Sequence, residues 1–230
     1  MICGVSFNCV NNLFNKILVF DLDDTLINAQ AIKDILFNFA GKSGCPRERA
    51  QNIYRNIRDD GFTLEKYTEA LSGVVDKKAE DILGRIRAEI IRCKDALVHK
   101  DALEFLELCK SKQTRLHLLT FGASSWQKEK IQMFGLDKYF QEAIFTDNEA
   151  SGKLRELEKI IGDGTGEQVV LFNDKLKEIV AILERYPEIV AYLRPVGKID
   201  DELWAVLDPS LRHRLEVLPN FRLLSPEIYV

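Results

Sequence analysis

The chain has 230 residues, of which 46% are hydrophobic, and it carries a formal net charge of −4 with a pI near 5.6. This length suits one domain with a substantial insertion, or two modest domains. The acidic balance argues against nucleic acid or an anionic membrane surface as the main partner, because both require a basic face. We therefore expect a small-molecule ligand, and the oligomeric state stays open.

The cysteines and the N-terminal segment bear on the expected compartment. The five cysteines are odd in number and contain no C-x-x-C pair, which argues against a disulfide framework or a zinc site. Residues 1–14 are mildly apolar but lack a basic leader, and no run elsewhere approaches the length that spans a bilayer. We expect a cytoplasmic protein.

The apolar run at residues 17–20 predicts a buried strand that ends at Asp21. Asp21 and Asp23 stand at alternate positions, so both carboxylates project to one side, with the Thr25 hydroxyl beside them. Burying two like charges together is costly unless a metal ion, a proton or a cationic group compensates. The pattern predicts a metal and phosphoryl site, and its alternative is an exposed turn.

Residues 28–96 contain no convincing strand and predict four amphipathic helices, at residues 30–40, 47–58, 64–71 and 77–92. Thr63 is the expected N-cap of the third helix. Because this insert directly follows the acid pair, we predict a helical cap that closes over the ligand and selects it. The alternative is a helical subdomain that only adds stability. The core would then comprise residues 1–27 and 97–230.

Beyond the insert, apolar strands alternate with helical periods. The expected strands lie at residues 116–119, 143–145, 169–172 and 189–193, and the expected helices at residues 102–110, 124–134, 154–161 and 176–185. This alternation is typical of βαβ units. It predicts an α/β fold, with a Rossmann-like parallel sheet core and an all-helical cap inserted after the first strand. Ligands of such sheets bind at the carboxyl ends of the strands.

Three later strand ends also carry polar residues. They are Thr120 with Phe121 and Gly122, Lys153, and Asn173 with Asp174 and Glu178. Thr120 offers a hydroxyl, and the loop after it offers backbone N–H groups at a helix start, which suits a phosphate. Lys153 also stands at a helix start, where a solvated surface lysine is the simpler alternative. Asp174 and Glu178 lie one helical turn apart, so both can face the same side.

In chain order, the strand ends carry Asp-x-Asp-x-Thr, Thr, Lys and Asp-x-x-x-Glu. This set resembles the four motifs of the haloacid dehalogenase (HAD) superfamily, and the match covers the whole predicted core. The insert is similar to the family's C1 cap. Residues 119–122, with Gln127 and Lys130 downstream, are similar to its nucleotidase and sugar-phosphate phosphatase branch. The fourth motif departs from the commonest pattern, with Asn173 for Gly and Glu178 for Asp.

The resemblance implies a phosphatase that uses Mg²⁺ to hydrolyse a small soluble phosphomonoester, such as a nucleotide or a sugar phosphate, through an aspartyl phosphate. It implies that Asp21 is the nucleophile and Asp23 the general acid and base. The implied phosphate ligands are Thr120, Phe121, Gly122 and Lys153. The implied Mg²⁺ ligands are Asp21, Asp23 through its carbonyl, and Asp174, with Thr25, Asn173 and Glu178 as supporting residues.

The chemistry needs these residue types. Mg²⁺ usually keeps waters beside one or two carboxylates and a substrate phosphate, and phosphoryl transfer requires the equatorial oxygens to be neutralised. The resemblance implies that dehalogenases lack the second Asp, so Asp23 favours phosphate hydrolysis. The alternatives are a phosphomutase of the same superfamily and a non-hydrolytic phosphate-binding or signalling domain. The cap residues that could recognise the substrate are Arg47, Tyr54, Arg55, Arg58 and Lys66. The tail after Lys198 carries no functional signal.

Overall fold

The computed structural model describes residues 13–146, 149–162, 168–197, 204–205 and 207–224. Its centre is a six-stranded sheet in the order β3-β2-β1-β4-β5-β6, in which every neighbouring pair is parallel. The strands are β1 (Ile17–Phe20), β2 (Arg115–Phe121), β3 (Glu142–Thr146), β4 (Val169–Asn173), β5 (Val190–Leu193) and β6 (Leu215–Val217). The expected α/β fold with a parallel sheet is confirmed. The sixth strand lies in the tail, where the sequence carried no signal.

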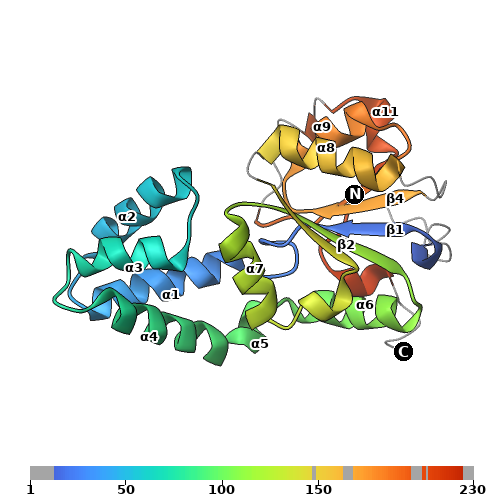
Figure 1. Cartoon of the computed structure of the whole chain (residues 1–230). Helices are drawn as coiled ribbons and strands as arrows, with labels where there is room; N and C mark the ends of the chain where they lie inside the picture. The colour runs from blue at the N-terminus through green and yellow to red at the C-terminus, as the bar shows by residue number, and fades with distance from the viewer. Residues whose placement is uncertain (1–12, 147–148, 163–167, 198–203, 206, 225–230) are drawn as a thin grey trace.

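Helices cover both faces of the sheet (Figure 1). On one face lie α8 (Glu149–Gly162), α9 (Leu176–Arg185) and α11 (Pro209–Arg212), and on the other lie α6 (Lys100–Ser111) and the 3-10 helix η3 (Phe221–Leu224). The helix α7 (Ser124–Met133) and the 3-10 helix η2 (Asp137–Tyr139) connect β2 to β3. Alternate residues of β1 enter two different apolar clusters, with Phe20 in one and Val19 in the other.

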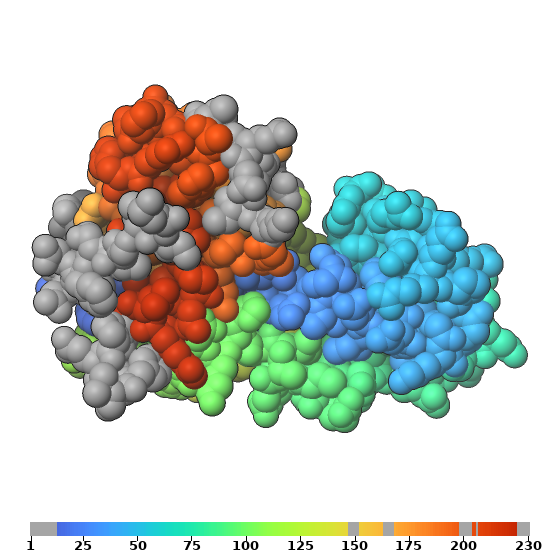
Figure 2. Space-filling model, turned by 180° about the vertical axis from the view of Figure 1, so that it is seen from behind, coloured from blue at the N-terminus to red at the C-terminus, as the bar shows by residue number. Residues whose placement is uncertain are grey.

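The insert forms the four expected helices, α1 (Ala29–Lys42), α2 (Arg47–Asp59), α3 (Leu64–Ser72) and α4 (Ala79–Arg92), followed by the short α5 (Lys94–Leu97). Thr63 is confirmed as the N-cap of α3, because its side chain accepts a hydrogen bond from the Lys66 amide at 3.2 Å. These helices form a separate lobe beside the sheet, seen from behind in Figure 2. We call this lobe the cap.

The two connections between the cap and the sheet run side by side. The Asn28 amide donates to the Leu97 carbonyl at 2.7 Å, and the His99 amide donates to the Leu26 carbonyl at 2.9 Å. Buried cap residues, among them Leu36 and Tyr67, belong to the same apolar cluster as Phe20 of β1. The cap therefore packs continuously onto the core, and its division from the core at residues 28–96 stays a prediction. Among the described helices, none has the length and apolar character to cross a membrane.

Candidate active site

A cavity of about 860 Å³ lies where the carboxyl ends of β1, β2 and β4 meet the cap. Asp21, Thr120 and Asp174 line it from these three strand ends, and Asp23 lines it from the loop after β1. The amide of Asp21 still donates to the Phe172 carbonyl at 2.9 Å, so the β1–β4 ladder extends to this residue. The parallel register thus brings together acids that are far apart in the sequence.

Lys153 contacts Asp21 and is only 2% exposed, so the surface alternative for this lysine is wrong. Its Nζ atom is 2.7 Å from Oδ1 of Asp21 and 2.8 Å from Oε2 of Glu178. Burial alone would lower the pKa of Lys153, but the two carboxylates outweigh burial and raise the pKa above its usual value. Lys153 therefore stays charged beside the expected nucleophile.

Gly152 explains how this lysine reaches the sheet. A Cβ atom at Gly152 would lie 2.9 Å from the Cβ atom of Thr146 at the end of β3. A side chain here would push α8 away from the strand. The glycine lets the helix approach closely enough for Lys153 to reach the end of β1.

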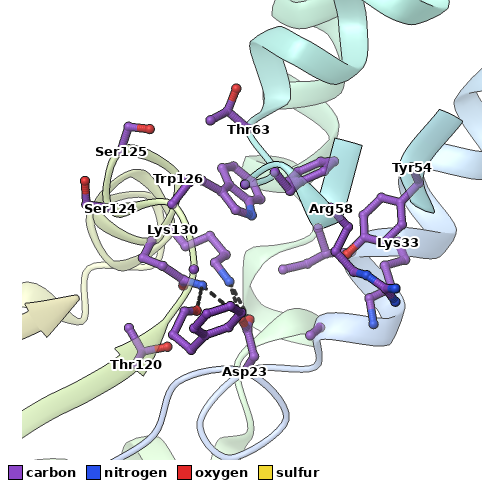
Figure 3. A pocket seen from close by; sticks show the side chains of 18 of the residues that line it. Asp23, Lys33, Tyr54, Arg58, Thr63, Thr120, Ser124, Ser125, Trp126 and Lys130 are labelled. Carbon is purple, nitrogen blue, oxygen red and sulfur yellow. Dashed lines mark hydrogen bonds and ion pairs between the residues drawn. The ribbon is translucent and has the colours of Figure 1, made fainter. Parts of the chain in front are cut away.

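Asp23 is held by a different lysine (Figure 3). Lys130 of α7 donates to both of its carboxylate oxygens, at 2.6 Å for Oδ2, and Gln127 donates to Oδ2 at 3.3 Å. Burial raises the pKa of Asp23, but the charge and hydrogen bonds of Lys130, together with Gln127, outweigh burial and hold the pKa below its usual value. The two acids of the first motif thus lie near each other, yet each has its own buried lysine.

The loop after β2 differs from the expected phosphate cradle. The Gly122 amide donates to the Thr146 carbonyl at 3.0 Å, so the prediction that this N–H is free for a phosphate is wrong. The Phe121 carbonyl accepts a hydrogen bond from Gln127 at 2.5 Å. Gly122 has a φ of +127°, and a Cβ atom there would lie 2.6 Å from Nε2 of Gln127, so the position requires glycine. The available amides lie further along, at the start of α7.

Thr120 and that helix start complete this side of the cavity. Thr120 lines the cavity and is buried, and its role as a phosphate ligand stays a prediction. Ala123, Ser124 and Ser125 follow it along the cavity wall. No side chain of a described residue caps α7 at Ala123. The first N–H groups of the helix can therefore meet an anion.

The carboxylate of Asp174 is suited to bind the expected Mg²⁺ ion. Its Oδ1 atom is buried and accepts no hydrogen bond from any described residue. Burial, and then the charge of Asp21, raise the pKa of Asp174 to about 7. A buried carboxylate of this kind is stabilised by a divalent cation, which removes the cost of desolvation and repulsion. Thr25 has a similar orphaned hydroxyl within the described part of the chain.

The described residues contain no group of three His, Cys, Asp or Glu side chains placed together as metal ligands. The predicted set of Mg²⁺ ligands needs only two carboxylate side chains, those of Asp21 and Asp174, because Asp23 would contribute its backbone carbonyl. Glu178 is paired with lysines, since its Oε2 atom accepts hydrogen bonds from Lys153 at 2.8 Å and from Asn173 at 2.9 Å, and its Oε1 atom lies 2.9 Å from Nζ of Lys175. Glu178 and Asn173 therefore support Lys153 in this structure.

The cap contributes the far wall of the cavity. Of the five cap residues singled out in the sequence, Tyr54, Arg58 and Lys66 line the cavity, whereas Arg47 and Arg55 do not. Arg47 instead pairs with Asp34 at 2.5 Å on the cap itself. The sequence analysis missed Lys33, Phe62 and Trp126, which also line the cavity. Trp126 is largely buried, at 6% exposed, although it lines the cavity.

Residues 15–194 match the family model described as haloacid dehalogenase-like hydrolase. The chain belongs to this family. The superfamily resemblance of the four motifs is thereby confirmed, and so is the general assignment as a hydrolase. The assignment to the C1-capped branch stays a prediction.

Solved structures of this family share the fold of the hydrolase. A candidate β-phosphoglucomutase from Thermotoga maritima is 20% identical, with a TM-score of 0.57, and the match covers 94% of this chain and 99% of that one. A candidate HAD hydrolase from Bacillus subtilis, bound to magnesium, is 13% identical, with the same TM-score and the same coverage of 94% and 99%. The L-2-haloacid dehalogenase from Xanthobacter autotrophicus is 16% identical, with a TM-score of 0.55 and coverage of 91% and 96%. No curated protein matches the hydrolase in sequence.

Proposed function

We propose that this hydrolase is a Mg²⁺-dependent phosphatase that acts on a small soluble phosphomonoester through an aspartyl phosphate on Asp21. The observation that carries the proposal is the environment of Asp21. A buried, charged Lys153 lies on one side of its carboxylate, and Asp174, with its orphaned oxygen, lies near it on another. This arrangement suits a nucleophile that must approach a phosphate, because nearby positive charge offsets the repulsion.

Asp21 and Asp174 would hold the metal ion, with the carbonyl of Asp23. When bound, Mg²⁺ would neutralise charge on the transferring phosphoryl group. Lys153 keeps the carboxylate of Asp21 in place and adds a fixed positive charge behind it. Thr120 and the N–H groups at the start of α7 would orient the remaining phosphoryl oxygens.

Asp23 would donate a proton to the leaving alkoxide and then accept one from the water that hydrolyses the aspartyl phosphate. Its ion pair with Lys130 favours the ionised carboxylate, which is the form that activates water. Protonation for the first step would follow when a bound phosphate adds negative charge beside Asp23. The presence of this second acid supports a phosphatase over a dehalogenase.

A phosphomutase is the second candidate, because the hydrolase shares its fold with a candidate β-phosphoglucomutase. A mutase would return the phosphoryl group to a bound product rather than to water. Chromatography of the products separates the two, since a phosphatase releases inorganic phosphate in step with substrate loss. We further propose a cytoplasmic location, and neither nucleic acid nor a membrane as a partner.

The direct test is hydrolysis of p-nitrophenyl phosphate by the purified full chain. We expect turnover with Mg²⁺ and loss of turnover in EDTA, restored when Mg²⁺ is added in excess. Full activity in the chelator would contradict the metal assignment. Release of halide from a 2-haloacid, without phosphatase activity, would favour the dehalogenase alternative.

A further inference from the structure

The cap wall of the cavity holds a positive charge that no described residue pairs with. Lys33 of α1 lines the cavity and forms no hydrogen bond or ion pair with any residue that the structure describes. Its charge reaches Asp23, where it adds to the groups that lower the pKa of that carboxyl. We call the side of the cavity formed by the carboxyl ends of the strands and by α7 the strand edge. By contrast with Lys33, the two lysines there, Lys130 and Lys153, are already paired with carboxylates. Lys33 is therefore free to attract an added anion.

Two further donors lie beside Lys33, as Figure 3 shows. Burial raises the pKa of Tyr54 to about 12, so its hydroxyl stays protonated, and no described residue accepts its hydrogen bond. Arg58 donates through Nε and Nη2 to Asp59, at 3.1 and 3.0 Å, which leaves Nη1 for a ligand. Asp59 offsets much of the Arg58 charge, so Lys33 supplies the main attraction and the other two add hydrogen bonds.

Three aromatic residues on the cap side of the same cavity, Tyr54, Phe62 and Trp126, do not form a stacking slot. Phe62 and Trp126 are only 8% and 6% exposed, and their ring centroids are 5.7 Å apart in an edge-on arrangement. Tyr54 packs against Phe62 at 4.9 Å. The rings thus cover one another, and a planar base would find no open pair of parallel faces. Beside Lys33, the cavity therefore offers charge and hydrogen-bond donors rather than a slot for an aromatic group.

We propose, on the basis of the phosphatase function above, that the substrate carries a second anionic group, which Lys33 binds with help from Tyr54 and Arg58. The transferring phosphate would lie at the strand edge, and the second anion, a carboxylate or another phosphate, would lie at the cap wall. Hydrogen bonds between charged groups are stronger than neutral ones and fix the orientation of the ligand. The cap would thereby select for charge at the end of the substrate that does not react.

A matched set of substrates tests this inference on the wild-type hydrolase. We would compare kcat/KM for n-propyl phosphate, 3-(phosphooxy)propanoate, 1,3-propanediol bisphosphate and adenosine 5′-monophosphate with Mg²⁺. At least one of the two doubly anionic compounds should exceed n-propyl phosphate by roughly tenfold or more. The better of these two identifies the second anion as carboxylate or phosphate. Equal values for the three propyl compounds, or a clear preference for the nucleotide, would overturn the inference.

Variants then assign the preference to the cap wall. Lys33→Met should lower kcat/KM for the preferred doubly anionic compound by roughly tenfold more than for n-propyl phosphate, and Lys33→Arg should restore most of the preference. Arg47→Gln is the matched control, because Arg47 lies on the same cap but outside the cavity, and its preference should equal that of the wild type. An equal loss on both substrates in Lys33→Met would overturn the assignment to a second anion.

The same measurements separate this inference from the phosphatase proposal. If the wild type fails to hydrolyse p-nitrophenyl phosphate with Mg²⁺, the phosphatase proposal fails and this inference fails with it. If it hydrolyses that compound but ignores the charge of the propyl series, only the charge selection is overturned.

Discussion

At the strand edge of the cavity, Asp21 and Asp23 are each paired with a buried lysine, whereas on the cap wall Lys33 and Tyr54 have no hydrogen-bond partner among the described residues. Groups that hold one another keep a fixed geometry, which the reacting atoms require. The half-buried Lys33 and Tyr54 remain available to a ligand, and a ligand that covered them without pairing with them would incur a cost. We therefore propose that the strand edge carries the chemistry and that the cap selects the substrate.

The largest expected effect comes from the strand edge. Asp21→Asn should abolish turnover of p-nitrophenyl phosphate, because an amide of the same shape is not a nucleophile for phosphorus. The steady-state release of phosphate with Mg²⁺ measures the loss. Asp34→Asn is a suitable control, since Asp34 pairs with Arg47 on the cap outside the cavity, and its rate should match the wild type. A wild-type rate in Asp21→Asn would contradict the nucleophile.

Asp23→Asn should have the next largest effect. A general acid or base contributes about a hundredfold to ten-thousandfold in rate, so kcat should fall by that range. Rapid-quench kinetics should show that formation and hydrolysis of the phosphoenzyme are both slowed, while KM changes little. An unchanged kcat would remove Asp23 from the proposed mechanism and would weaken the contrast between the two walls.

A third prediction concerns stability rather than turnover. Asp101 of α6 accepts hydrogen bonds from Arg194 at 2.8 and 3.0 Å and from the Phe221 amide at 2.8 Å, so it joins the core to η3. The side chains of Asp101 and Arg194 are both largely buried. Asp101→Asn should lower the free energy of unfolding by about 1.5–3 kcal/mol. Urea unfolding at pH 7 measures the change, and kcat at saturating substrate should stay at the wild-type value.

The difference in the free energy of unfolding between the wild type and Asp101→Asn depends on pH through the pKa of Asp101. Burial raises that pKa, but the hydrogen bonds from Arg194 and Phe221 outweigh burial and hold it below 3.8 in the folded chain. A lowered folded pKa gives stability that is complete above the unfolded value and is lost as the pH falls through the folded one. The difference in the free energy of unfolding between wild type and variant should therefore be constant near neutral pH and shrink below about pH 4. A gap that widens in acid would contradict the ion pair.

The smallest expected effect comes from the contact between cap and core. Arg87 of α4 donates to Glu129 of α7 at 2.5 Å and also pairs with Glu65 of the cap. Partly exposed ion pairs contribute about 0.2–1 kcal/mol, so Arg87→Gln should raise KM by no more than about fivefold through a looser cap. Arg85→Gln, on the same helix and exposed, is the control. A tenfold fall in kcat at saturating substrate would show that the contact does more than hold the cap.

Much of the fold was predictable because its signals are local. Short apolar runs separated by helical periods predicted the first five strands, and the Thr63 cap of α3 followed from residue type alone. The sixth strand, Leu215–Val217, was missed because three residues at the edge of a sheet carry too little pattern to be distinguished from a loop. The free Gly122 amide was wrongly predicted because its acceptor, the Thr146 carbonyl, belongs to another strand.

The cap wall was only partly predictable. Charged residues on amphipathic helices usually face solvent, and no sequence pattern separates Arg58, which lines the cavity, from Arg55, which does not. Lys33 was missed for the same reason. In the core, Gln127 and Lys130 are three positions apart on α7, and this helical spacing signals a shared face, although it does not name Asp23 as their target.

The sequence by itself determined that two carboxylates emerge together from a buried strand, because alternation along a chain is a property of neighbouring residues. The tertiary structure decided which charges compensate them. Lys153 is 132 positions from Asp21, and Lys130 is 107 positions from Asp23. Such partners meet only when the parallel sheet and its helices pack, since their distance depends on every element in between. The electrostatic environment of each acid, on which its proposed chemical role depends, is set at that level.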